Sequence, residues 1–117
     1  MLHNLDAKTF EENLAQNPLP VLVYFWSSSC DECHHYFPVL EDMSLYFSDQ
    51  ITVVTINLES NPEIVSKYTI IGSPMIQVFV KGIQRYAFAG TISPFRLTRH
   101  LLEGKFITNK STEPLDD

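Results

Sequence analysis

Residues 21–33 read VLVYFWSSSCDEC, which is a run of six apolar residues, then three serines, then two cysteines separated by two residues. The apolar run from Val21 to Trp26 contains β-branched and aromatic residues without polar alternation, a pattern typical of a strand covered on both faces. Serines are common in loops and helix caps. The stretch therefore predicts a buried strand, a short loop at Ser27–Ser29, and a helix that begins near Cys30.

The helix predicted after this strand is long and extends from about Cys30 to Phe47. One apolar stripe runs along Phe37, Leu40 and Ser44 or Phe47, with Tyr36, Met43 and Tyr46 or Phe47 beside it. Pro38 inside the helix predicts a kink because proline removes a backbone hydrogen bond. Residues 51–57 (ITVVTIN) predict a second buried strand. Two such strands joined by a helix form a parallel βαβ unit with a right-handed crossover.

The rest of the chain continues the alternation of helices and strands. A first helix is predicted over Asp6–Asn17, with Asp6 or Thr9 as its cap. Asn61 as cap and Pro62 at the first helical position open a short helix that ends near Tyr68. After a break at Gly72–Pro74, antiparallel strands are predicted at Met75–Val80 and Gln84–Ala89, joined by Lys81 and Gly82. A last helix runs from Ser93 and Pro94 to about Leu102. This order predicts an α/β sandwich, in which helices cover both faces of a mixed sheet.

Length and composition narrow the class of protein. The chain of 117 residues, 44% of them hydrophobic, fits one domain, predicted over residues 1–108 with a polar, frayed tail at 109–117. A net charge of −6 argues against partners such as nucleic acid or an anionic membrane surface. The N-terminal residues lack a signal-peptide pattern and the longest apolar run is too short to span a bilayer, so we expect a cytoplasmic protein.

The two cysteines carry the strongest chemical signal. At the start of a helix, Cys30 can lie beside free backbone amides, while Cys33 follows about one turn later, so that the sulfurs can reach disulfide distance. The amides and the positive end of the helix dipole favour a thiolate on Cys30, whereas Cys33 is expected to be more buried. A C-x-x-C pair at a strand–helix junction of a βαβ unit indicates redox chemistry.

At this point the sequence resembles the thioredoxin family over nearly its whole length. The resemblance rests on the strand leading into C-x-x-C, on Pro38, on residues 57–62 (NLESNP), on residues 71–74 (IGSP), and on the strand pair from Val78 to Gly90. It implies a thioredoxin-like three-layer sandwich. It also implies thiol–disulfide exchange, in which Cys30 is the nucleophile and Cys33 resolves the mixed disulfide.

The same resemblance assigns further roles. Pro74 would follow a cis peptide bond and pack against the cysteines, and the Ser73 backbone would pair with an extended substrate chain. Trp26 and Gly90 would complete the substrate-binding surface. No cofactor or metal is implied besides the redox-active disulfide; the implied partners are protein disulfides and a thioredoxin reductase, and we expect a monomer.

The chain also departs from the family pattern at three positions near the cysteines. Ser29 stands where the family usually has tryptophan, Tyr24 where it has a buried aspartate, and Thr55 where it has that aspartate's partner lysine. The aspartate is thought to help deprotonate the second cysteine. The candidate bases left are Glu32, His34, His35 and water.

Asp31 and Glu32 lie between the two cysteines and have opposing effects. Acidic residues stabilise a helix N-terminus, but their charge disfavours a thiolate beside them. We therefore expect a reducing pair rather than an efficient disulfide donor, with His34 and His35 offsetting the acids when protonated.

Four other interpretations of the cysteine pair stay open at the level of sequence. Cys30 and Cys33 could be inert core residues. C-x-x-C followed by His34 also matches a c-type haem attachment pattern. Cys30 and Cys33 with His34 or His35 could bind a metal, although zinc sites usually need more ligands. Finally, the domain could be a protein-interaction module with weak or no redox turnover.

Overall fold

The computed structural model describes residues 2–108. Its elements are β1 (His3–Leu5), α1 (Ala7–Gln16), β2 (Val21–Trp26), α2 (Asp31–Tyr46), β3 (Thr52–Asn57), α3 (Glu63–Lys67), β4 (Met75–Val80), β5 (Ile83–Ala89) and α4 (Pro94–Glu103). The strands form one sheet in the order β1-β3-β2-β4-β5. Strands β1, β3 and β2 are parallel, whereas β4 is antiparallel to β2 and β5 to β4.

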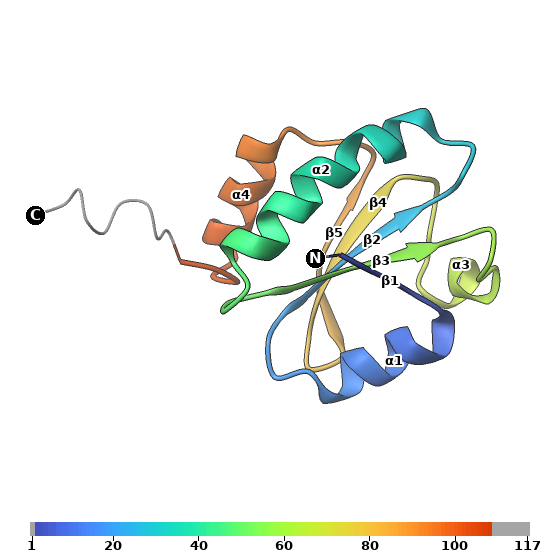
Figure 1. Ribbon diagram of the computed structural model, residues 1–117. Coiled ribbons are helices and arrows are strands. Elements are labelled where there is room, and N and C mark those ends of the chain that lie inside the picture. The colour runs from blue at the N-terminus through green and yellow to red at the C-terminus, as the bar shows by residue number, and fades with distance from the viewer. Residues whose placement is uncertain (1, 109–117) are drawn as a thin grey trace, which may run out of the picture.

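Helices cover both faces of this mixed sheet. In Figure 1, α2 and α4 lie on one face, and α1 and α3 lie on the other. The predicted three-layer sandwich is therefore confirmed, as are the parallel βαβ unit made of β2, α2 and β3 and the antiparallel hairpin made of β4 and β5.

Strand β2 lies at the centre of the molecule and contributes to both layers. Leu22 and Tyr24 pack with residues of α2 and α4, whereas Val21, Val23 and Phe25 pack with residues of α1 and α3. All five side chains are buried. This explains why the sequence shows no polar alternation here, since neither face of the strand contacts water.

Helix α2 is anchored through one apolar face. Cys33, Tyr36, Leu40 and Met43 are its buried residues. Phe37 is only half-buried and packs at the edge of the same core, so the buried face includes Tyr36 and Met43, which were predicted beside the stripe, rather than Phe37. Spacings of three and four residues connect Cys33 to Tyr36, Leu40 and Met43, which places them on the sheet-facing side. Pro38 lies inside the helix as expected, and the kink there stays a prediction.

Two local features differ from the sequence-based prediction. Strand β1 was missed because it is a three-residue edge strand without an apolar pattern, and it is defined by its parallel pairing with β3. Asn61 was expected to cap α3, but Pro62 occupies the cap position without a side-chain cap bond. The Asn61 amide instead accepts from Ala7 N–H at 3.0 Å and donates to the Asn57 carbonyl at 2.9 Å. Asn61 therefore provides a hydrogen-bond acceptor for the backbone N–H of Ala7, which has no partner within helix α1.

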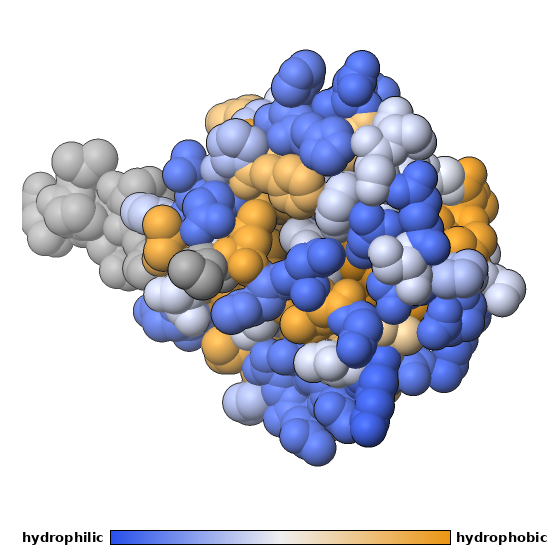
Figure 2. Space-filling view, turned by 45° about the vertical axis from the view of Figure 1, so that its right-hand side comes forward, coloured by the Kyte–Doolittle hydropathy of each residue, from blue (hydrophilic) through white to orange (hydrophobic). Residues whose placement is uncertain are grey.

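Hydrophilic side chains cover most of the face shown in Figure 2, with apolar side chains in smaller patches between them. Within residues 2–108, no helix has the length and apolar character needed to cross a membrane. The polar tail predicted at residues 109–117 lies outside the described residues, so the domain limit at residue 108 stays a prediction.

Candidate active site

Cys30 and Cys33 form a disulfide at the start of α2, with their Cα atoms 5.3 Å apart. Cys30 is the N-cap residue of the helix and is partly exposed, whereas Cys33 is fully buried. The Cys30 sulfur accepts a hydrogen bond from the Cys33 backbone N–H at 3.1 Å. In the reduced protein, a thiolate on Cys30 would lie at the same amide and at the positive end of the helix.

The loop before Cys30 is held by side chains from neighbouring elements. Ser28 N–H donates to the Glu59 carboxylate at 2.9 Å, and the Asn57 amide donates to the Ser28 hydroxyl at 3.2 Å. The ring nitrogen Nε2 of His34 lies 3.1 Å from the Ser28 carbonyl oxygen, which can only accept, so the ring donates. Hydrogen bonding from the Ser28 side chain and backbone holds the pKa of Glu59 below its usual 4.5.

Three loops meet at the disulfide end of the sheet. The Ser73–Pro74 peptide bond is cis, as the resemblance implied. The hydroxyls of Ser27 and Ser73 lie 3.1 Å apart, which joins the loop after β2 to the loop before β4. Gly90 N–H donates to the Pro74 carbonyl at 2.8 Å, which adds the loop after β5. The sheet therefore brings Ser73, Pro74 and Gly90, all named from the sequence, into one neighbourhood.

Trp26, at the end of β2, is part of an aromatic cluster beside the first turns of α2. Its ring meets Phe37 edge-to-face at 5.2 Å and His34 at 5.6 Å. Its indole N–H donates to the Asn4 side-chain oxygen at 3.3 Å, and the Thr55 hydroxyl donates to the same oxygen at 3.0 Å. Asn4 was not identified from the sequence, because its role depends on the unpredicted strand β1.

Tyr24 is the residue that the resemblance matched to the family's buried aspartate. Its side chain is 1% exposed, and its hydroxyl donates to the Cys33 carbonyl at 3.0 Å. Its ring stacks on that of Tyr36 with centroids 5.8 Å apart. Burial, with smaller contributions from Tyr36 and Glu32, raises the pKa of Tyr24 well above its usual 10, so the hydroxyl remains a neutral donor.

The stacked tyrosines provide a matched test of this hydrogen bond. Tyr24→Phe should lower the free energy of unfolding by about 1 kcal/mol, because a buried hydroxyl bond is lost. Tyr36→Phe should change it by less than about 0.5 kcal/mol, because the buried Tyr36 hydroxyl has no hydrogen-bond partner among the described residues. Urea unfolding of the oxidised proteins measures the free energy of unfolding of each variant relative to the wild type. An equal cost for the two variants would contradict this account of Tyr24.

Asp31, Glu32, His34 and His35 are all exposed on the first turns of α2. Glu32 and His35 also line an open pocket of about 360 Å³, together with Tyr36 and residues 91–93. Within residues 2–108, no three His, Cys, Asp or Glu side chains are grouped so that they could hold a metal ion.

The fold and the cysteine pair together define a thiol–disulfide oxidoreductase that works through a dithiol at a helix N-terminus. The family model described as Thioredoxin matches residues 1–103. A thioredoxin of Rickettsia bellii is 38% identical over 85 residues, which cover 73% of this chain and 81% of the relative. Thioredoxin 1 of Synechococcus elongatus is 31% identical over 93 residues, covering 80% and 87%. The chain belongs to the thioredoxin family.

Proposed function

We propose that the protein reduces disulfide bonds of other proteins, with Cys30 as nucleophile and Cys33 as resolving thiol. The thiolate of Cys30 attacks one sulfur of the substrate disulfide, and the other substrate sulfur leaves as a thiolate that takes up a proton. Cys33 then loses its proton and attacks the Cys30 sulfur, which releases the second substrate thiolate. Two electrons and two protons pass to the substrate, and the Cys30–Cys33 disulfide forms.

One observation carries this assignment of roles. The partly exposed Cys30 caps α2 and receives the Cys33 amide, while Cys33 lies fully buried behind it. Only the outer sulfur can meet a protein substrate first. In this proposal the Ser73 backbone pairs with the substrate chain, and Trp26, Pro74 and Gly90 complete the docking surface; the exposed Ser73 lies beside the loop that leads to Cys30.

The proton on Cys33 needs an acceptor during the second step. The Tyr24 hydroxyl cannot serve, because it already donates to the Cys33 carbonyl and remains protonated. Glu32, His34, His35 and water are the candidate acceptors in this proposal, and His34 also fixes the loop through the Ser28 carbonyl.

Asp31 and Glu32 set the proposed direction of electron flow. Their charges lie in the first turn of α2 and disfavour a thiolate on Cys30, which makes the dithiol a better reductant.

Removing both charges with Asp31→Asn and Glu32→Gln should make the reduction potential less negative by about 10–20 mV. This corresponds to about 0.5–1 kcal/mol at a helix terminus. Equilibration with dithiothreitol measures it. The control pair Glu12→Gln and Asp42→Asn, which neutralises two exposed acids elsewhere, should leave the potential unchanged. An unchanged or more negative potential in the first pair would contradict the proposed tuning.

The proposal also includes the protein's location, its oligomeric state and its electron donor. It acts in the cytoplasm as a monomer, through one domain at residues 1–108, and needs no cofactor beyond its own disulfide. A thioredoxin reductase returns electrons to it.

Insulin reduction tests the function directly. With dithiothreitol as electron donor, the protein should accelerate insulin precipitation, and a thioredoxin reductase with NADPH should replace dithiothreitol. The changes at Ser29, Tyr24 and Thr55 favour the alternative of an interaction module, whereas the retained cysteine pair disfavours it. Failure to accelerate insulin reduction with either donor, together with stable partner binding by a cysteine-free variant, would favour that module instead.

A further inference from the structure

A pocket opens between the first turns of α2, the helix that begins at the disulfide, and the loop after β5. Tyr36 and Ile92 form its apolar part, and both side chains are buried. Glu32, His35 and the hydroxyl residues Thr91 and Ser93 complete its lining. The loop on its far side follows Gly90, whose N–H bond to the Pro74 carbonyl fixes it next to the substrate-binding loop. The pocket is therefore connected to the cysteine pair through Glu32 and to the proposed substrate-binding loop through Gly90.

Acidic side chains are concentrated around the helix start that carries the disulfide. Asp31 and Glu32 lie between the cysteines, and the carboxylate of Glu59 is fixed on the Ser28 amide with its pKa lowered. Glu32 is the only Asp or Glu in the pocket lining, and that lining contains no lysine or arginine. His34 and His35 follow these acids on α2, and His35 lines the pocket as well.

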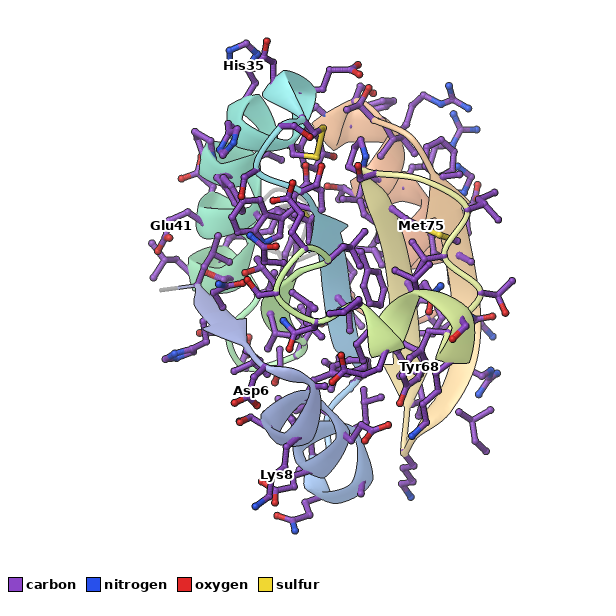
Figure 3. The ribbon with its side chains drawn as sticks, turned by 90° about the vertical axis from the view of Figure 1, so that its right-hand side faces the viewer. Asp6, Lys8, His35, Glu41, Tyr68 and Met75 are labelled. Carbon is purple, nitrogen blue, oxygen red and sulfur yellow. A yellow bond between two sulfur atoms is a disulfide. The ribbon has the colours of Figure 1, made fainter. Side chains whose placement is uncertain are left out.

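Three of the basic side chains, those of Lys8, Lys67 and Arg99, belong to other parts of the surface. Lys67 pairs with Glu11, which places it between α3 and α1. Arg99 pairs with Glu103 on α4. Arg96 lines a separate pocket with Arg99, although its backbone N–H donates to the hydroxyl of Ser93 at the edge of the pocket described here. In Figure 3, Lys8 lies at the opposite end of the molecule from His35.

We propose that this site prefers protein disulfides with a lysine or arginine next to the attacked cysteine, and that this cation lies in the pocket against Glu32. The proposal rests on the reducing function proposed above. The chemistry fits because lysine and arginine combine an apolar stem, which can lie on Tyr36 and Ile92, with a charged end for Glu32. Opposite charges across such a contact raise the association rate and steer the correct partner.

Two disulfide peptides test the proposal, identical except for lysine or glutamate after the attacked cysteine. The pre-reduced protein is mixed with each peptide under single-turnover conditions, and the rate ratio is divided by the ratio for dithiothreitol alone. This division removes the intrinsic reactivity of each peptide. We expect a corrected ratio of about 3–10 in favour of lysine at low salt, falling toward 1 in about 1 M salt.

Glu32→Gln should lower the corrected ratio by about three-fold, the size expected for one partly exposed charge pair. Any effect of this substitution on Cys30 itself acts on both peptides and cancels in the ratio. The control Glu12→Gln makes the same charge change on α1 and should leave the ratio unchanged.

Three results would overturn the proposal. A wild-type corrected ratio near 1, with both peptides reduced, would overturn it while leaving the reducing function intact. An equal fall in the ratio for Glu32→Gln and Glu12→Gln would show that net charge acts rather than the pocket. Reduction of neither peptide would overturn the reducing function together with the proposal.

Discussion

Cys30→Ser is expected to lose disulfide-reducing activity almost completely, with a fall of at least roughly 1,000-fold in the rate of insulin reduction. A serine hydroxyl is not ionised near neutral pH and cannot form a mixed disulfide. Cys33 cannot take over, because it is fully buried behind the helix start. The measurement is the insulin assay with dithiothreitol as donor, corrected for the rate with dithiothreitol alone.

This loss must be separated from a loss of folding. The proper reference is the reduced wild-type protein, because neither it nor the Cys30→Ser variant then contains the disulfide. Urea unfolding in dithiothreitol should give free energies within about 1 kcal/mol of each other, because the substitution at the partly exposed cap residue removes little packing. If the folded variant kept more than about a tenth of the wild-type rate, Cys30 would not be the nucleophile.

Cys33→Ser is expected to lose multiple turnover but to keep the first step. Cys30 can still attack the substrate disulfide, and without a resolving thiol the mixed disulfide remains. The variant should therefore consume about one substrate molecule per chain and then stop until an external thiol releases it. The measurement is the amount of disulfide peptide consumed by the pre-reduced variant without added thiol. Continued consumption of the peptide at a rate close to that of the wild type would mean that the protein works through one cysteine, which would contradict the two-step account.

Much of the fold could be predicted from local sequence. The unbroken apolar pattern of Val21–Trp26 reflects a strand packed by helices on both faces, and the serines and Cys30 mark where that strand becomes a helix. The α/β order and the hairpin followed from such local patterns. The cysteine pair was identified because its spacing, its position and its chemistry agree.

The features that were missed depend on contacts between distant segments. Strand β1 exists through pairing with β3, and Asn4 became visible as a partner of Trp26 and Thr55 only in that register. Asn61 has the residue type of a helix cap, yet its amide bonds to α1 and to the end of β3.

The surroundings of the cysteines were only partly predictable for the same reason. The cis bond before Pro74 came from family resemblance and not from the residues themselves, since most bonds before proline are trans. The match of Tyr24 to the family aspartate likewise comes from the resemblance and stays a prediction. The bond from Tyr24 to the Cys33 carbonyl could not be predicted, because it requires the relative placement of β2 and α2.

The most direct test of the central claim is the intact mass of the two cysteine variants after reaction with a disulfide peptide. We predict that Cys33→Ser gains the mass of one disulfide-linked peptide half, reversibly with dithiothreitol, and that Cys30→Ser gains none. A mixed disulfide that accumulates on Cys30→Ser instead of Cys33→Ser would contradict the assignment of Cys30 as nucleophile and Cys33 as resolving thiol.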